Sequence, residues 1–290
     1  MHLFCSAGFG LSFVGRQENP PEPTPLTSPL FLLLVAVAAA VGAAMNSVAG
    51  GGTLVTFPAL IALGVPSITA NATSTVALWP GSMSSLWGYR GELKGARQWA
   101  IAFAVPSLLG GILGALLLLR TPEQRFAAIV PWLILGATAL FMAQKPLMRL
   151  ILAVGPAGPR RAITTESGSL SAPAPAYLAY QFLVGIYGGY FGAGAGILML
   201  ASLGLMGLTN IHQMNGLKNW GGGVMNFVAV VIFAVSGIVD WPVAGAMAVG
   251  ATFGGIGGSL MAQRVGQEWV RRAIVAIGLG SGLAMLFGLI

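Results

Sequence analysis

The chain carries one glycine-rich motif twice, as Ala49-Gly-Gly-Gly-Thr-Leu-Val55 and, 144 residues later, as Ala193-Gly-Ala-Gly-Ile-Leu-Met199. Apolar residues match by chance in a sequence of this kind, but asparagines, arginines and clustered glycines do so much less often. Several such residues keep the same spacing without a gap: Asn71 and Asn215, Gly110 and Gly254, Gly114 and Gly258, and Arg120 and Arg264. The chain is therefore predicted to contain two copies of one unit.

The composition is that of an integral membrane protein. Hydrophobic residues make up 56% of the chain and charged residues 7%, against roughly 25% charged in soluble domains. The polar stretches are short, so any activity is expected to lie within the membrane. The net charge of +7 comes mostly from short loops, where basic residues set orientation, and nucleic-acid binding is not expected. The single Cys5 excludes an internal disulfide and a cysteine metal cluster, and neither a metal nor a cofactor is expected.

The predicted fold is an all-α polytopic membrane protein with about eight full spans plus short broken or re-entrant helices. The predicted organisation is an irregular N-terminal tail at 1–28, a first membrane repeat at 29–150, a linker rich in Gly, Pro and Ser at 151–172, and a second membrane repeat at 173–290. Up to ten apolar segments are expected, at 29–45, 48–64, 68–89, 98–119, 124–143, 173–192, 195–209, 212–236, 242–262 and 270–290.

The basic residues indicate how the two repeats are oriented, because Lys and Arg collect on the cytoplasmic side of a membrane protein. Inverted repeats would place ten cations on one side and two on the other, whereas parallel repeats would place seven and five. The main contrast is between the loop with Arg90, Lys94 and Arg97 and its counterpart at 236–240, which holds no cation. The sequence therefore favours inverted repeats, each with an odd number of crossings.

The glycine clusters predict a break between two short helices in each repeat. Backbone groups that are unpaired in hydrocarbon cost several kcal/mol each, so such clusters need a structural reason. Breaks at corresponding points of two repeats are typical of a transporter binding site, and the N–H groups there favour an anion. The alternative is close helix packing on small residues, which is the preferred interpretation of Gly110, Gly114, Gly254 and Gly258. The candidate binding residues at the breaks are Asn46, Gly50, Gly51, Gly52, Gly194 and Gly196.

A polar stripe follows each break, on one face of the next predicted helix. Its candidate binding residues are Asn71, Thr73 and Ser74 in the first copy and Asn215, Lys218 and Asn219 in the second. A charge such as Lys218 inside a span costs at least about 2.5 kcal/mol, and no acidic residue lies in the same stretch, so a bound anion is the favoured partner. The alternatives are that Lys218 snorkels to the interface and that the asparagines and serines bond between helices.

His212 lies six residues before Lys218 and is a candidate proton relay. The alternative is that it satisfies backbone groups at the start of a helix.

At these residues the chain resembles the sulfite exporter TauE/SafE family, also called the 4-toluene sulfonate uptake permease family. The resemblance covers about residues 30 to 290 and is carried by Ala49-Gly-Gly-Gly-Thr53, Pro58 and Ala72-Thr-Ser74, and by Phe191-Gly-Ala-Gly-Ala-Gly196 and Asn215-Gly-Leu-Lys-Asn219. It implies a multi-pass transporter of the bacterial inner membrane that carries sulfite, sulfonates or related small organosulfur anions. The second half departs from the first, with Lys218 where the first has Ser74 and Ser202 where it has Pro58.

The resulting hypothesis is a secondary transporter that works by alternating access around a midplane anion site. An anion channel is the alternative, and an intramembrane enzyme is disfavoured because no acid, base or metal-ligand constellation is present. The expected partners are a small anionic substrate and the lipid bilayer, and assembly into a homo-oligomer is left open.

Overall fold

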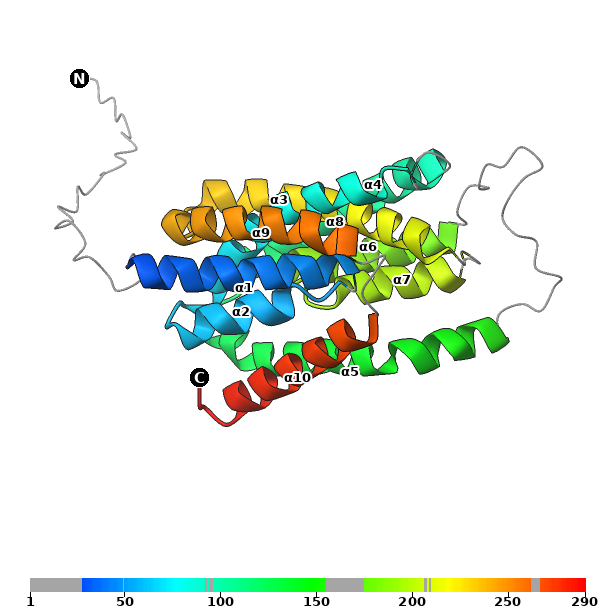
Figure 1. The fold of residues 1–290 in the computed structure, drawn as a ribbon. Helices are drawn as coiled ribbons and strands as arrows, with labels where there is room; N and C mark the ends of the chain where they lie inside the picture. Colours follow the sequence, from blue (N-terminus) through cyan, green and yellow to red (C-terminus); the bar gives the residue numbers. More distant parts are fainter. Residues whose placement is uncertain are drawn as a thin grey trace, which may run out of the picture.

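The computed structural model describes residues 28–48, 50–91, 93, 96–154, 175–205, 208, 210–261 and 267–290. This part of the chain is helical, without strands (Figure 1). Its helices are α1 Pro29–Val48, α2 Thr53–Ala62, α3 Ser67–Tyr89, α4 Arg97–Leu119, α5 Glu123–Val154, α6 Pro175–Tyr190, α7 Ala195–Leu205, α8 Ile211–Ser236, α9 Trp241–Met261 and α10 Gln267–Leu286. The predicted tail, except Ser28, and residues 155–172 of the predicted linker lie outside the described residues.

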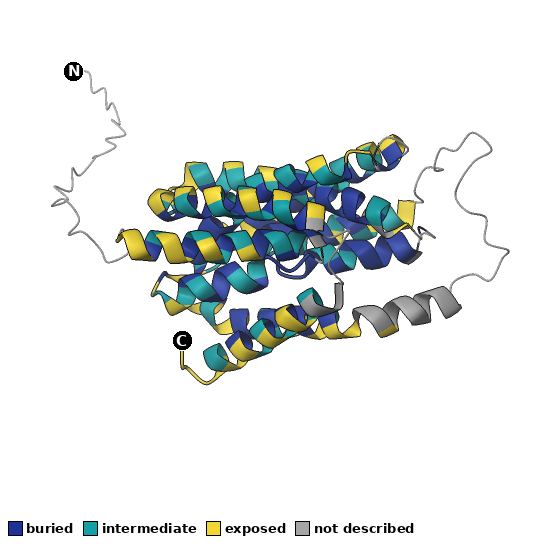
Figure 2. Ribbon diagram, in the orientation of Figure 1, coloured by how far each residue is buried: buried dark blue, intermediate teal, exposed yellow. Residues whose placement is uncertain are grey.

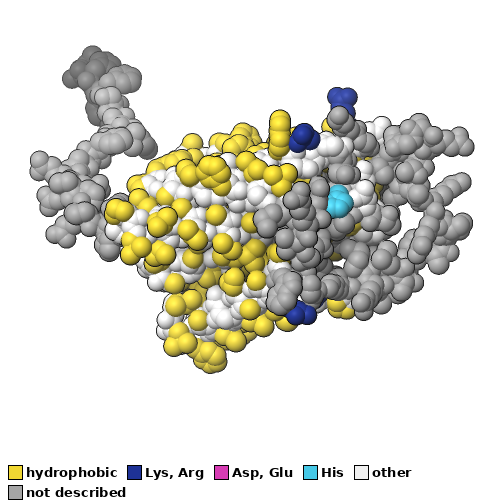
Figure 3. Space-filling model, viewed as in Figure 1, with side chains coloured by type: hydrophobic (Ala, Val, Ile, Leu, Met, Phe, Trp, Pro, Cys, Tyr) yellow, Lys and Arg dark blue, Asp and Glu magenta, His cyan; other side chains and the backbone are white. Residues whose placement is uncertain are grey.

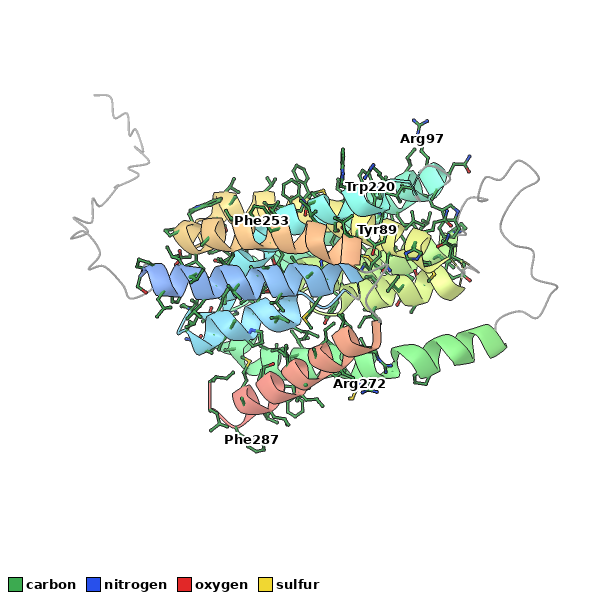
Figure 4. All side chains as sticks on the ribbon, in the orientation of Figure 1. Tyr89, Arg97, Trp220, Phe253, Arg272 and Phe287 are labelled. Atoms are coloured by element: carbon green, nitrogen blue, oxygen red, sulfur yellow. The ribbon has the colours of Figure 1, made fainter. Side chains whose placement is uncertain are left out.

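In the part of the chain that the structure describes, five helical segments are long and apolar enough to cross a membrane: Pro29–Ser47, Arg97–Leu119, Glu123–Ala143, His212–Ser236 and Trp241–Leu260. Large apolar side chains face outward over the bundle (Figure 3), and Phe253 and Phe287 project from it (Figure 4). A surface of this kind suits lipid and not water, so the fold is that of a multi-pass membrane protein. The number of eight full spans stays a prediction.

Helix ends are set by local hydrogen bonds. The side chain of Asn210 accepts from the backbone N–H groups of His212 and Gln213 at the start of α8, as N-cap residues do. The helix ends at Gly237, which has a φ of 75°. The start of α3 is capped by another helix, because the Glu123 carboxylate accepts from the backbone N–H groups of Ser67 and Ile68. This bond ties the first turns of α3 and α5 together.

The helices pack in matching pairs. Helix α1 packs on α9 and α6 packs on α4, while α3 packs on α9 and α8 packs on α4. Small residues make the closest contacts: Gly258 of α9 lies against Ala44 of α1, and Gly110 of α4 lies against Gly185 of α6. These contacts bring the backbones together without a side chain between them. The buried residues follow these contacts through the middle of the bundle (Figure 2).

Helices α3 and α8 meet in the centre and run in opposite directions. The Trp79 indole N–H donates to Gly223 O at 3.0 Å, whereas Tyr89, ten residues later, lies against Gly216. Helices α5 and α10 also form an antiparallel pair, along one side of the bundle (Figure 1). Helices α3, α4 and α5 begin at 67, 97 and 123, and α8, α9 and α10 each begin 144 residues later, at 211, 241 and 267.

Candidate functional site

Each glycine cluster lies between two helices. The first separates α1 from α2, and the second separates α6 from α7. Gly50 has a φ of 88° and Gly194, at the corresponding position, has a φ of 77°. Both values lie in the left-handed region, which glycine adopts without the steric penalty of a side chain. The same local chain reversal therefore occurs at the same point of each motif.

The two breaks touch each other inside the bundle. A Cβ atom on Gly50 would lie 3.0 Å from the Cα of Gly196, and one on Gly196 would lie 2.9 Å from the Cα of Gly50. Real Cβ atoms essentially never come closer than 3.0 Å to another heavy atom, so a side chain at Gly196 is excluded by the contact. At Gly50 the contact is tight and the φ of 88° also favours glycine, and the hairpins α1–α2 and α6–α7 meet backbone to backbone.

A cavity of about 50 Å³ lies where the two breaks meet the facing sides of α3 and α8. One water needs roughly 10–15 Å³ of such space, so the cavity has room for about three to five waters or one small solute. Its lining residues are Asn46, Gly50, Thr53, Thr75, Leu78, Ser82, Gly188, Phe191, Gly192, Ala195, Gly196, Met199, Lys218, Asn219, Gly222, Met225 and Asn226.

The first residues of two helices contribute to the cavity wall. Thr53 begins α2, and Ala195 and Gly196 begin α7. The first N–H groups of a helix have no partner within that helix, and they carry the positive end of its dipole. Two such ends at one cavity make its potential favourable for an anion.

Lys218 reaches this cavity from α8 and is 3% exposed. Its ammonium group donates to Asn46 O at 2.9 Å and lies 3.5 Å from Ser47 O. Both carbonyls belong to the last turn of α1, which is the negative end of that helix. Among the described residues no carboxylate pairs with Lys218. The side chain is therefore buried and does not snorkel, and helix α1 supplies its partner.

Asn71 of the first half makes the corresponding bond to the end of α6 in the second half. Its side-chain Nδ2 donates to Tyr190 O at 3.0 Å, at the C-terminal end of α6. Helix α3 thus caps α6, just as α8 caps α1. Asn71 does not line the cavity.

Asn219 is 4% exposed and lines the cavity beside Lys218. Its buried Nδ2 has no hydrogen-bond partner among the described residues. An unsatisfied buried donor costs about 1–3 kcal/mol, so this group is suited to an acceptor that enters the cavity.

The structure brings together Asn46, Gly50, Gly196, Lys218 and Asn219 of the predicted site residues. The other predicted glycines pack elsewhere: Gly51 against Phe141, Gly52 against Gly42, and Gly194 against Ala137.

The predicted site residues Thr73, Ser74, Asn215 and His212 lie outside the cavity lining. Thr73 Oγ1 accepts from the backbone N–H of Asp240 at 3.0 Å, and Ser74 shares a 2.6 Å bond with Thr56. Asn215 is buried, with Oδ1 unpartnered among the described residues. His212 lies in the first turn of α8, also away from the cavity.

The lining residues that sequence reasoning did not select are mainly small or apolar. Asn226 shares the polar stripe with Lys218 and Asn219 in the sequence, and the same helical spacing leads to Gly222 and Met225, so this part of the wall could have been found by extending the stripe. Gly188 and Met199 carried no comparable signal. Among the described residues, no group of three or more His, Cys, Asp and Glu side chains could hold a metal ion.

Comparison with known proteins agrees with this architecture. The family model described as "Sulfite exporter TauE/SafE" matches residues 34–285. A probable membrane transporter protein, ORF9, of a Sinorhizobium species is 28% identical over 260 residues, which cover 88% of this chain and 92% of the relative. A probable membrane transporter protein of Haemophilus influenzae is 28% identical over 238 residues, which cover 80% of this chain and 85% of the relative.

The probable membrane transporter protein YfcA of Escherichia coli K12 is 26% identical over 264 residues, covering 90% of this chain and 92% of YfcA. No solved structure matches the chain significantly. Since the family match extends over most of the sequence, including both breaks and the cavity, the chain belongs to the sulfite exporter TauE/SafE family of membrane transporters.

Proposed function

We propose that this chain is a secondary transporter that moves small organosulfur oxoanions, such as sulfite or a short sulfonate, across the bacterial inner membrane. The observation that carries the proposal is the buried Lys218 beside the unpartnered donor of Asn219 in one cavity. The family to which the chain belongs consists of transporters, so the chain is not an enzyme. The family name supports sulfite or a related anion as the substrate class.

The chemistry of the cavity favours a compact oxoanion over a cation or a neutral solute. Lys218 offers a positive charge, Asn219 a hydrogen-bond donor, and the first turns of α2 and α7 offer the positive ends of their helix dipoles. Charge-assisted hydrogen bonds of this kind are stronger than neutral ones, and several oxygens on one sulfur atom can accept them together. A solute about the size of three to five waters fits the space.

The two halves act as inverted repeats in this proposal. Support comes from the helix starts, which are 144 residues apart in three consecutive pairs, and from the antiparallel contacts of α3 with α8 and of α5 with α10. If α3 corresponds to α8, an antiparallel contact between them means that one half is upside down relative to the other. Rocking of such halves around a shared site gives alternating access.

Lys218 couples anion binding to movement of the halves. In the structure its ammonium group holds the C-terminal end of α1, which belongs to the opposite half. An anion that enters the cavity competes with Asn46 O for the same ammonium group. Binding therefore weakens a bond between the halves, and release of the anion restores it.

The membrane potential supplies a driving force for export. Moving one charge through 100 mV is worth about 2.3 kcal/mol, and an inside-negative potential expels an anion. A proton relay through His212 has less support, because this residue does not line the cavity. An anion channel is the alternative class and differs from a carrier in its kinetics.

The test is flux in liposomes reconstituted with the purified protein and loaded with sulfite. If the protein is a carrier, efflux should be saturable and should be accelerated by sulfite or methanesulfonate on the opposite side of the membrane. If it is a channel, anion on the opposite side should not accelerate the flux. Liposomes with Lys218→Met protein serve as the control and should leak no faster than empty ones. If the Lys218→Met protein shows the same flux as wild type, the anion does not pass through the cavity. If wild type transports no sulfur anion, the proposed substrate class is contradicted.

A further inference from the structure

One position in the cavity wall has no packing reason to be glycine. On α8 the lining residues Lys218, Asn219, Gly222 and Met225 follow helical spacing, so they share the face that borders the cavity. Gly222 lies in the middle of this face. A Cβ atom at Gly222 would meet no atom within 4 Å. The volume that a side chain would occupy there is therefore part of the cavity.

Other glycines of the same wall behave differently. A Cβ atom on Gly196 would come within 2.9 Å of the Gly50 backbone, and one on Gly188 would collide with the side chain of Met225. At Gly196 a neighbouring backbone excludes a side chain, and at Gly188 the end of the Met225 side chain already fills the space. Gly222 has no such neighbour, although glycine weakens a helix interior relative to alanine.

The opposite wall shows what the cavity would be without this glycine. Thr75, Leu78 and Ser82 line it from α3, and each lies 144 residues before a lining residue of α8: Asn219, Gly222 and Asn226. Leu78 thus occupies the position that corresponds to Gly222, and it is 5% exposed. A leucine on one side and a glycine on the other shift the open space toward α8.

Polar groups mark how a solute would lie in this space. Lys218 and the unpartnered Nδ2 of Asn219 lie one helical turn before Gly222. Ser82 and Asn226 line the cavity too, and Asn226 lies one turn after Gly222. An oxyanion group held by Lys218 and Asn219 would therefore place any substituent on its sulfur atom next to Gly222.

We propose that Gly222 determines the size of the anion that the cavity accepts, because the missing side chain provides the room for a short organic substituent of a sulfonate. This inference rests on the proposed transport of sulfur oxoanions and narrows it. Sulfite needs only the part of the cavity at Lys218 and Asn219. A sulfonate with a short substituent also needs the space over Gly222, and a bulky aromatic sulfonate exceeds it.

The test compares wild type, Gly222→Ala and Gly222→Leu in reconstituted liposomes with sulfite, methanesulfonate, 2-hydroxyethanesulfonate and 4-toluenesulfonate as competing anions. Gly222→Ala should weaken competition by 2-hydroxyethanesulfonate about tenfold or more relative to competition by sulfite, measured in the same variant. Gly222→Leu should fill the space and abolish competition by every sulfonate. Gly245→Ala and Gly245→Leu are matched controls, because Gly245 is exposed on α9 and a Cβ atom there would also meet no atom within 4 Å.

The outcomes separate this inference from the transport proposal. If wild type transports sulfur anions and the sulfonates compete in the same order in both Gly222 variants, Gly222 does not determine the size of the anion. The transport proposal would then still stand. If no sulfur anion is transported, the same panel is repeated with formate, acetate and butyrate. If smaller carboxylates compete better than larger ones, and Gly222→Ala excludes the larger ones more strongly, the inference is supported without the transport proposal. Competition that does not depend on the size of the carboxylate would overturn it.

Discussion

Two side chains from opposite halves make the same kind of bond in different surroundings. Lys218 holds the end of α1 at Asn46 O, and Asn71 holds the end of α6 at Tyr190 O. Lys218 is charged and borders the cavity, whereas Asn71 is neutral and lies outside it. In the proposed mechanism Lys218 exchanges its carbonyl partner for the anion, whereas Asn71 only holds two helices together.

Replacement of Asn71 by leucine is predicted to lower stability without weakening anion binding. The Tyr190 carbonyl would lose its donor, and a buried unsatisfied group costs about 1–3 kcal/mol. Asn219→Leu is the matched control with the opposite expectation, since the Asn219 Nδ2 has no partner to lose and the residue lines the cavity. Thermal unfolding and anion affinity measured on both variants check this, and a loss of affinity in Asn71→Leu as large as in Asn219→Leu would assign Asn71 to the binding site.

The sequence alone shows the polarity of these residues but not their partners. Lys218 and Asn219 stand out because polar groups inside a span need a reason, and the same argument selects Asn71, Thr73 and Ser74. The structure gives Thr73 a partner in Asp240 and Ser74 one in Thr56. Such partners depend on which helices touch, so a single sequence does not distinguish ligand-binding groups from groups satisfied within the protein.

At the scale of elements, the breaks are the feature that a sequence predicts best. Runs of apolar residues locate the ten helices of the described residues, and the glycine clusters locate the interruptions between α1 and α2 and between α6 and α7. The contact of Gly50 with Gly196 is not predictable, because it requires the two hairpins to approach from different parts of the chain. The same holds for Gly222, whose proposed role comes from the open space beside it and not from a motif.

Gly50→Ala is predicted to destabilise the protein more than Gly64→Ala does. Both glycines have left-handed φ values, 88° and 85°, so each substitution carries a strain of roughly 1–2 kcal/mol. Only Gly50 also faces a backbone, at 3.0 Å from Gly196, whereas a Cβ atom on Gly64 would meet nothing within 4 Å. Unfolding temperatures in detergent measure the difference, and equal losses would show that the contact between the breaks contributes nothing.

At the scale of the whole molecule, the basic residues gather at one end of the helices. The contact of Gly88 with Ser259 brings the C-terminal ends of α3 and α9 together. Arg90 and Arg97 follow the first of these ends and Arg271 and Arg272 the second, and Arg97 and Arg272 extend outward from the helices in Figure 4. Arg120 and Arg125 lie at the junction of α4 and α5, at the opposite end. This distribution agrees with the charge argument for inverted repeats.

Thiol labelling of intact cells tests the inversion. In a Cys5→Ser background, Gly91→Cys and Ser236→Cys place one exposed thiol in each of two corresponding loops. Inverted repeats predict that an impermeant reagent labels Ser236→Cys from outside and Gly91→Cys only after the membrane is opened. Labelling of both from the same side would mean that the repeats are parallel.

The most direct measurement of the central claim is thermal unfolding of the purified protein in detergent with sulfite, methanesulfonate or acetate, repeated on Lys218→Met. A ligand at 100 times its Kd stabilises a protein by about 2.7 kcal/mol, so a sulfur anion that binds in the cavity should raise the unfolding temperature of wild type. The shift should vanish in Lys218→Met, because the cavity then offers no charge. An equal shift in Lys218→Met, or no shift of wild type with either sulfur anion, would contradict a site for sulfur oxoanions at Lys218.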